Sequence, residues 1–275
     1  MFTLNCNGKF LLAEKPLVMG ILNITNDSFY AGSRLNSTEM ILEKAAQMIQ
    51  DGADILDIGA QSTRPGSERI SAKEEIEKAV PVIQLIKAKF PEMVLSIDTY
   101  QAEVARECVA AGASIVNDIS GGEMDKYMIK TVAGLKVPYI CMHMKGVPET
   151  MHLDTNYDDV LKDLLDYFIR KTDECIKAGI KDMIIDPGFG FGKNIAQNFF
   201  LLKNLHVFKM LEKPILCGLS RKSTIYKTLG ISSEEALNGT TVLNTLAIRN
   251  GADILRVHDV KEAVEVVRLI EKYSC

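Results

Sequence analysis

The sequence lacks the closely spaced ligands from which a metal site or a redox motif is usually built. Its six cysteines are scattered over 275 residues without a CxxC pair, which excludes a zinc ribbon and a thioredoxin-type motif. Scattered cysteines in a chain of this length are typical of buried or idle thiols in a reducing compartment. The four histidines show no HExxH or similar spacing, so the sequence argues against a zinc or iron site.

Long apolar runs and an excess of basic residues are also missing. No run reaches the roughly eighteen consecutive apolar residues of a transmembrane helix, and residues 1–16 do not have the pattern of a signal peptide. The 32 basic and 36 acidic side chains give a net charge of −4, which leaves no broad surface for nucleic acid. We therefore expect a cytoplasmic protein that binds neither membrane nor nucleic acid, although a local basic pocket for an anionic substrate stays compatible with this charge.

Short apolar runs alternate with helix-length segments along the chain. The eight runs are 17–24, 54–58, 94–98, 114–119, 138–143, 183–186, 214–219 and 253–257. Their uniform apolarity is typical of buried parallel strands. The segments between them include 38–51, 73–90, 102–111, 157–178 and 234–250. This alternation predicts an α/β fold and, at about 32 residues per unit, a (β/α)8 TIM barrel, with a doubly wound open sheet as the alternative.

A repeated glycine supports a single repeating unit. Residues 51–53, 111–113, 178–180 and 250–252 each place a glycine between a predicted helix and the next strand, where a left-handed residue ends a helix. No linker composition divides the chain, so residues 1–275 are predicted to form one domain. Asn7-Gly8 within residues 3–12 predicts a leading β-hairpin, with an irregular tail as the alternative.

Polar residues stand at or near the ends of the predicted strands. One such residue is usually a cap or a turn residue, but many converging on one rim would each need a partner. Carboxylates and amides suit the edges of a heterocycle, while Lys and Arg suit an anion. In a TIM barrel, this rim carries the chemistry. The residues are Asn23, Asp57, Asp98, Asn117, Asp118, His143, Asp186, Lys222, Arg256 and His258.

Three loops extend this pattern. Residues 61–66 combine hydroxyls, Arg64 and a Pro-Gly turn, although a surface turn with a solvated arginine would look the same. Residues 186–193 form a glycine-rich loop that matches neither GxGxxG nor a P-loop. Residues 220–223, Ser-Arg-Lys-Ser, follow the seventh strand, where barrels often hold phosphate; a solvated helix turn is the equal alternative. Asn23 could supply one oxygen to Mg2+ carried by a substrate's phosphates.

Taken in order, nine short motifs resemble the dihydropteroate synthases of bacterial folate biosynthesis. They span most of the chain and are Gly20–Thr25, Asp27–Phe29, Ser62–Gly66, Ser96–Thr99, Asn117–Gly122, Met142–Met144, Asp186–Lys193, Ser220–Ser223 and Arg256–Asp259. The resemblance implies a TIM barrel that joins 6-hydroxymethyl-7,8-dihydropterin diphosphate to p-aminobenzoate and releases pyrophosphate. It also implies a homodimer, Mg2+ as cofactor and inhibition by sulfonamides.

The resemblance implies three groups of binding residues. Pterin would be bound by Asp98, Asn117, Met142, Asp186 and Lys222. The diphosphate would be held by Asn23 through Mg2+, with Arg64, Arg256 and His258. The p-aminobenzoate side would comprise Thr63, Arg64, Phe191, Lys222 and Ser223. Within these groups, the residues expected to carry catalysis are Lys222, Asp98, Arg256 and Asp186.

The first loop departs from the family pattern. Asn26 replaces a proline and Ala31 replaces an aspartate, which predicts altered kinetics rather than lost activity. Two other functions remain open: a methyltransferase acting between methyltetrahydrofolate and a corrinoid protein, and a catalytically silent pterin-binding subunit. The dimer would use apolar faces within 225–229 and 242–248, unless these faces belong to the core.

Overall fold

The fold begins with the predicted β-hairpin. The computed structural model describes residues 1–24, 34–61, 69–148, 150–151 and 155–274. Strands β1 (Phe2–Cys6) and β2 (Lys9–Ala13) pair antiparallel. Asn7 and Gly8 connect them with φ angles of 55° and 87°, a left-handed turn that asparagine and glycine tolerate best. The prediction of a hairpin within residues 3–12 is confirmed.

Eight parallel strands follow and close into a barrel. They are β3 (Leu17–Asn23), β4 (Ile55–Gly59), β5 (Val94–Asp98), β6 (Ile115–Asp118), β7 (Tyr139–Met142), β8 (Met183–Asp186), β9 (Leu216–Cys217) and β10 (Ile254–Val257). A parallel bridge between Ile185 and Ile215 joins the two ends of the sheet. The TIM barrel is therefore confirmed, and the open-sheet alternative is wrong. Strand β9 is shorter than the predicted run 214–219, which starts with a proline that cannot donate to a ladder.

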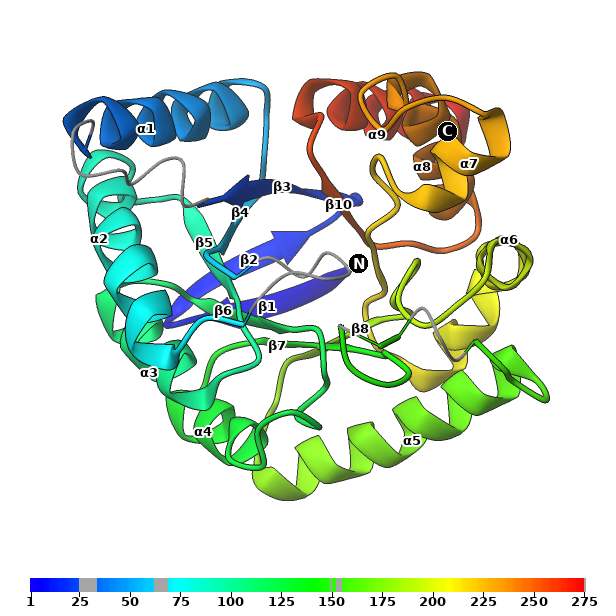
Figure 1. Ribbon diagram of the computed structural model, residues 1–275, viewed down its shortest axis with the longest axis horizontal. Helices are drawn as coiled ribbons and strands as arrows, with labels where there is room; N and C mark the ends of the chain where they lie inside the picture. The colour runs from blue at the N-terminus through cyan, green and yellow to red at the C-terminus, as the bar shows by residue number, and fades with distance from the viewer. Residues whose placement is uncertain (25–33, 62–68, 149, 152–154, 275) are drawn as a thin grey trace.

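Helices surround the strands in a ring (Figure 1). They are α1 (Arg34–Gln50), α2 (Ala72–Lys89), α3 (Ala102–Ala111), α4 (Met128–Leu135), α5 (Val160–Ala178), α6 (Ile195–Lys203), the 3-10 helix η2 (Leu205–Leu211), α7 (Ser223–Leu229), α8 (Leu237–Arg249) and α9 (Val260–Ser274). The glycines predicted to end helices all have positive φ, from 98° to 124° (Gly52, Gly112, Gly179 and Gly251). Each lets the chain leave a helix and enter the next strand within a few residues.

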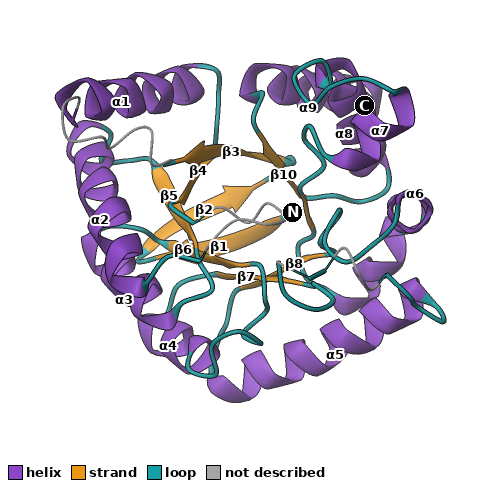
Figure 2. Cartoon of the chain, in the orientation of Figure 1, coloured by secondary structure: helices purple, strands orange, loops and turns teal. Residues whose placement is uncertain are grey.

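The hairpin closes the N-terminal end of the barrel, and it lies within the ring of helices in Figure 2. Leu4, Cys6 and Ala13 pack against a layer of inward-facing residues from the barrel strands. That layer comprises Leu17, Met19, Ile55, Val94, Ile115, Ile140, Ile184, Leu216 and Ile254. Since this end is filled with apolar side chains, the inward-facing polar groups lie toward the opposite rim.

The structure also bears on the cysteines and on membrane-spanning helices. The five described cysteines are all free and buried, as the sequence indicated for them. Among the described residues, no helix is long and apolar enough to span a membrane. The assignment of residues 1–275 to one domain stays a prediction.

The hairpin should contribute measurably to stability through its inner face. Leu4 is 2% exposed whereas Leu12 on the same hairpin is 54% exposed. We expect Leu4→Ala to lower the free energy of unfolding by about 2–5 kcal/mol, because it opens a cavity in the layer that it fills. The matched control Leu12→Ala should change it by less than about 0.5 kcal/mol. Urea unfolding monitored by circular dichroism measures both, and equal effects would contradict the packing.

Candidate active site

The inward-facing residues of the strands form two layers, one apolar and one polar. Ile55, Val94, Ile115, Ile184 and Ile254 belong to the apolar layer above the hairpin. Because inward-facing residues recur every second position along a strand, the residues two positions later face the same interior. They are Asp57, Ser96, Asn117, Asp186 and Arg256, and all except Arg256 are buried. The barrel therefore carries a polar layer directly above its apolar layer.

Arg256 is the centre of this layer. Its Nε donates to Oδ2 of Asp57 at 2.6 Å, and its Nη2 donates to Oδ2 of Asp98 at 2.5 Å. Asn117 donates from Nδ2 to the same Oδ2 of Asp57 at 3.0 Å. Strands β4, β5, β6 and β10 thus meet in one hydrogen-bonded network that includes Asp98, Asn117 and Arg256 of the predicted site.

Burial controls the protonation of Asp98. Removal from water raises the pKa of Asp98 to about 7, the positive charge of Arg256 opposes this rise, and the nearby charge of Asp57 adds to it. The other oxygen of Asp57, Oδ1, is buried without a hydrogen-bond partner in the described part of the chain. A buried acceptor of this kind indicates a place for a ligand donor or a water molecule.

Asn23 lies at the rim beside this network. It is exposed at the end of β3, where it pairs in register with Gly59, which in turn pairs with Asp98. A Cβ atom at Gly59 would lie 3.4 Å from Oδ1 of Asn23 and 3.7 Å from Oδ2 of Asp98. Glycine therefore keeps open the space between these two side chains.

Asp186 begins the glycine-rich loop. Its Oδ1 accepts a hydrogen bond from the amide of Gly188 at 2.8 Å, which turns the chain directly after β8. Burial raises the pKa of Asp186, and the positive charge of Lys222 opposes the rise. The carboxylate therefore serves both the local turn and the electrostatics of the site.

Lys222 connects this loop to the segment after β9. It is the N-cap residue of α7, and its Nζ donates to the carbonyl oxygen of Phe189 at 2.5 Å. The same Nζ lies 4.7 Å from the ring centroid of Phe191, within the range of a cation–π contact. Burial lowers the pKa of Lys222 to about 8, with Asp186 opposing. Ser223, also predicted for the site, is the first residue of α7.

Apolar side chains form a separate cluster at this rim. Met142, at the end of β7, packs with Tyr100 and Ile119, and Phe191 packs against them together with Met124 and Met144. This places Met142 and Phe191, which the sequence assigned to two different substrates, in one cluster. A flat ring could contact the cluster while its edge meets the polar layer.

His258 lies beyond the network. Its Nδ1 is 3.0 Å from Oγ of Ser220, and burial lowers its pKa to about 4, with the charge of Arg256 acting in the same direction. It also borders a cavity of about 430 Å³ that residues of α1 and the start of α9 help to line. In the described residues, His258 has no hydrogen bond to another predicted site residue.

Arg221 of the 220–223 motif has a structural role in the loops after β9 and β10. Arg221 has a φ of 54°, and its guanidinium binds both carboxylate oxygens of Asp259 at 2.8 and 2.9 Å. It also donates to the carbonyl oxygens of Ser233 and Glu234. Arg221 therefore joins the segments that follow β9 and β10, and Lys222 is the cation of this motif that faces the rim.

Sequence reasoning named two buried groups without giving either a binding role. Asp57 stands among the strand-end residues, and its position two residues after Ile55 was a usable signal for a place in the polar layer. Lys193 ends the glycine-rich loop; it is 7% exposed and donates to backbone carbonyls, which no spacing rule would have found. Asp118, one of the strand-end residues, binds Ser120, Gly122 and Tyr139, so it organises the loop after β6. Thr63, Arg64, Asn26 and Ala31 lie outside the described residues.

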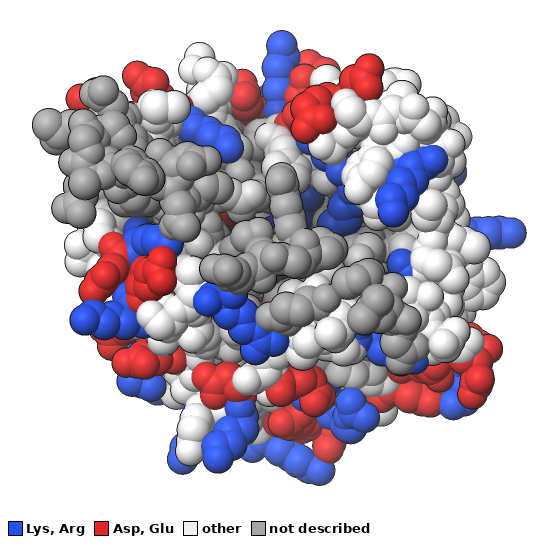
Figure 3. Space-filling model, in the orientation of Figure 1, with Lys and Arg blue, Asp and Glu red and all other residues white. Residues whose placement is uncertain are grey.

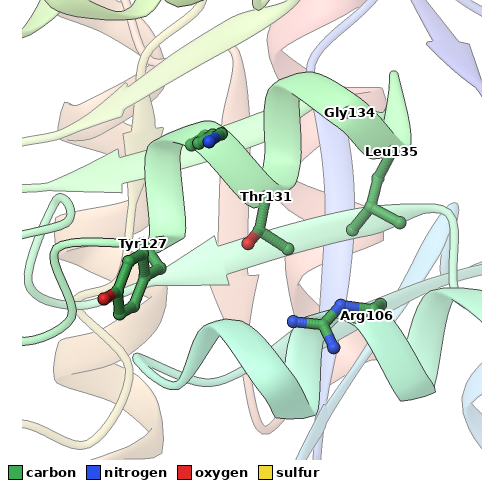
Figure 4. Close-up of a pocket in the computed structure, with 6 residues that line it drawn as sticks. Arg106, Tyr127, Thr131, Gly134 and Leu135 are labelled. Carbon is green, nitrogen blue, oxygen red and sulfur yellow. The ribbon is translucent and has the colours of Figure 1, made fainter.

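The surface agrees with a local basic site on an acidic protein. In Figure 3, acidic and basic side chains mix around the edge of this face, and basic side chains are visible in a recess nearer its centre. A separate cavity of about 450 Å³ lies on the outside of the barrel between α3 and α4, lined by residues that include Arg106, Tyr127 and Leu135 (Figure 4). None of the strand-end residues lines it.

In the described part of the chain, no group of three or more His, Cys, Asp or Glu side chains could hold a metal ion.

The fold and the site define a class of protein: a TIM-barrel enzyme with buried acid, amide and cationic groups at its catalytic rim. A family model described as pterin binding enzyme matches residues 19–258. Dihydropteroate synthase of Escherichia coli K12 is 42% identical over 266 residues, which cover 96% of this chain and 94% of the relative. The chain therefore belongs to the dihydropteroate synthase family of pterin-binding enzymes.

Two solved structures agree with this assignment. Yersinia pestis dihydropteroate synthase with a sulfonamide drug complex has a TM-score of 0.93 at 38% identity, and 99% of each chain is covered. Xanthomonas albilineans dihydropteroate synthase in complex with 7,8-dihydropteroate has a TM-score of 0.88 at 34% identity. That match covers 100% of this chain and 99% of the Xanthomonas chain.

The raised pKa of Asp98 gives a testable pH dependence of stability. Since the folded pKa of about 7 exceeds the ordinary 3.8, the folded protein binds this proton more tightly than the unfolded chain. The stabilisation from that proton is complete below the ordinary pKa and is lost as the pH rises through the folded pKa. The free energy of unfolding of the wild-type protein should therefore decrease between about pH 5 and pH 8. In Asp98→Asn this decrease should be smaller, by at least about 1 kcal/mol.

Chemical denaturation at the two pH values measures this difference. The control is Asp166→Asn, which removes a carboxylate that is 61% exposed in an ion pair on α5 and should leave the wild-type slope unchanged. An Asp98→Asn variant with the wild-type slope would show that Asp98 is ionised across this range.

Proposed function

We infer that the chain condenses 6-hydroxymethyl-7,8-dihydropterin diphosphate with p-aminobenzoate to give 7,8-dihydropteroate and pyrophosphate. The observation that carries this inference is the network of Arg256, Asp57, Asp98 and Asn117 above an apolar barrel floor. The Xanthomonas relative binds 7,8-dihydropteroate, and the Yersinia relative is complexed with a sulfonamide drug. Identity to dihydropteroate synthases over nearly the full chain favours this function over a corrinoid methyltransferase or a silent subunit.

The polar layer matches the edge of a pterin. The 2-amino and N3–H groups of the ring need acceptors, which Asp98 and Asp186 supply, and its carbonyl oxygen needs a donor, which Asn117 or Lys222 supplies. Met142 is 3% exposed and belongs to the apolar cluster, so it can contact the face of the ring. We propose that these residues bind the pterin.

Pterin binding would release part of Arg256. In the network, Nη2 of Arg256 donates to Oδ2 of Asp98, and Nε donates to Oδ2 of Asp57. A pterin N–H that binds Oδ2 of Asp98 would share this oxygen with Nη2 and weaken that hydrogen bond. The guanidinium would keep its hydrogen bond to Asp57 and could turn its other nitrogen atoms toward the diphosphate. Arg256 is suited to this role because guanidinium matches the geometry of phosphate oxygens.

Diphosphate departure requires compensation of its developing charge. Arg256 would supply one positive charge, and His258 and Arg64 are proposed to bind the same group. Asn23 is exposed at the end of β3, and we propose that its side-chain oxygen binds a cation. A single amide oxygen fits Mg2+ that arrives with the substrate's phosphates. When bound, Mg2+ would neutralise charge on the leaving diphosphate.

The aniline nitrogen of p-aminobenzoate is a weak, neutral nucleophile. It therefore needs correct positioning more than it needs a general base. Phe191, Lys222 and Ser223 lie in the segments after β8 and β9, and we propose that they form this side of the site together with Thr63 and Arg64. Departure of the diphosphate followed by attack of the aniline nitrogen would complete the reaction.

We also propose that the protein is cytoplasmic and that it forms a homodimer. The composition and the free cysteines support a cytoplasmic protein. Homodimerisation is supported by exposed apolar side chains within the predicted faces: Leu229 of α7 is 55% exposed, and Val242 and Leu246 of α8 are 51% and 44% exposed. Ile225 and Leu243 of the same segments are buried, so these faces belong partly to the core.

An assay of pyrophosphate release tests the proposed function directly. The purified protein should release pyrophosphate when both substrates and Mg2+ are present, and omission of p-aminobenzoate or chelation of the metal should suppress release. A sulfonamide should compete with p-aminobenzoate. Absence of release when both substrates and Mg2+ are present would contradict the proposed function.

Arg256→Gln should weaken binding of the diphosphate end of the substrate more than binding of its pterin ring. Loss of charged hydrogen bonds to the diphosphate should raise KM for the diphosphate substrate about tenfold or more. Binding of 6-hydroxymethyl-7,8-dihydropterin, which lacks the diphosphate, should weaken by a smaller factor, because this ligand loses only the support that Arg256 gives to Asp57 and Asp98. Steady-state kinetics and calorimetry measure the two effects, with Arg249→Gln on α8 as the control. Equal losses for both ligands would place Arg256 on the pterin ring instead.

A further inference from the structure

Lys193 is a buried lysine that the proposed reaction does not use. Its side-chain nitrogen donates to three backbone carbonyl oxygens: that of Phe191 at 2.9 Å, that of Gly188 at 3.0 Å and that of His143 at 3.3 Å. The residue is 7% exposed. Among the described residues, it has no carboxylate within ion-pair distance.

Three carbonyl acceptors require the charged form of this amine. Only the ammonium group has three N–H donors, so each donor can serve one carbonyl. Burial of an ammonium group without a paired carboxylate is costly unless all of its donors are satisfied. Burial also lowers the pKa of Lys193 to about 7, with Asp186 opposing this change. The chain therefore keeps a costly group in a place where it joins specific pieces of backbone.

The three carbonyls belong to two loops of the candidate site. His143 directly follows β7, whereas Gly188 and Phe191 lie in the glycine-rich loop after β8. Gly188, Gly190 and Gly192 have φ angles of 67°, 82° and 63°, so the backbone folds back on itself around the ammonium group. A Cβ atom at Gly188 would collide with the carbonyl oxygen of His143. The two loops are thus packed backbone against backbone.

The same loop carries the groups that face the substrates. Between two carbonyls bound by Lys193, the carbonyl of Phe189 accepts from Lys222, and the ring of Phe191 lies against Lys222. Asn198 supports the other side of the loop, since it accepts from the amide of Gly190 and donates to the carbonyl of Lys193. Lys193 thus holds the backbone of Phe191 through its carbonyl oxygen, while the side chain of the same residue contacts Lys222.

We propose that Lys193 is a positioning residue that fixes the glycine-rich loop against the β7 loop and thereby sets the p-aminobenzoate side of the site. This proposal rests on the proposed function for the identity of the substrate. The geometric part, that Lys193 holds Phe191 in place, stands on the hydrogen bonds alone. Pterin binding depends chiefly on strand residues of the polar layer and should be less sensitive to the loop.

Lys193→Met tests the catalytic consequence, because it keeps the length of the side chain and removes its donors. KM for p-aminobenzoate should rise about tenfold or more, since a displacement of about 1 Å at a site can cost up to about a hundredfold. Binding of 6-hydroxymethyl-7,8-dihydropterin should change less than about threefold. The control Lys203→Met, at the exposed end of α6, should leave both unchanged. An unchanged KM in folded Lys193→Met would overturn the proposal.

A tryptophan reporter tests the loop without any enzyme assay. The chain contains no tryptophan, so Phe191→Trp introduces a single tryptophan, which can be excited selectively, at the loop itself. Emission maximum and acrylamide quenching should differ between Phe191→Trp and the double variant Phe191→Trp/Lys193→Met. Identical spectra and quenching would contradict the positioning role. If wild type releases no pyrophosphate, the proposed function fails, while this measurement still decides the role of Lys193.

If Lys193→Met does not fold, Lys193→Arg carries the test. A planar guanidinium keeps the charge but cannot direct three N–H groups to carbonyls arranged for a tetrahedral ammonium. KM for p-aminobenzoate should then rise about threefold or more at unchanged pterin binding. A wild-type KM in this variant would overturn the proposal.

Discussion

The guanidinium group of Arg256 is the interaction on which the polar layer depends. It bonds to Asp57 and Asp98 at once, and Asp186 is a third buried carboxylate of the same layer. Three buried carboxylates without a cation would repel one another and lose hydration, which is costly in a barrel interior. Arg256 makes the arrangement tolerable, and Lys222 adds a second positive charge whose attraction opposes the raised pKa of Asp186.

This layer can exist only because the layer beneath it is closed. The hairpin fills the N-terminal end of the barrel with Leu4, Cys6 and Ala13, so the polar layer can be approached only from the rim. Burial then disfavours the charged form of three of these groups: it raises the pKa of Asp98 and of Asp186 and lowers the pKa of Lys222. Stability is built at one end of the barrel and recognition at the other, as is usual for this fold.

Much of this arrangement was predictable from the sequence because it follows simple periodicities. Strands β5 and β8 have the predicted bounds, and the polar residues stand two positions after apolar ones on the same face, as Asp186 does after Ile184. The hydrogen bonds were not predictable in the same way. Asp57 and Arg256 are 199 positions apart, and nothing local to either residue specifies the other. Arg221 and Lys193 depend on left-handed backbone angles at Arg221 and at three loop glycines, which determine where a neighbouring side chain points.

The charge arrangement also couples the two ends of a pterin diphosphate. A pterin N–H bound in the proposed way would share Oδ2 of Asp98 with Nη2 of Arg256, so recognition of the ring would weaken one of the two hydrogen bonds that restrain Arg256. The remaining hydrogen bond to Asp57 keeps the guanidinium close while its other nitrogen atoms become available to an anion. In the proposed binding mode, a ligand with both a pterin edge and a diphosphate would satisfy both Asp98 and Arg256, whereas a free anion would compete with Asp98 for Arg256. In this way, a protein with a net charge of −4 could select an anionic substrate by its uncharged end.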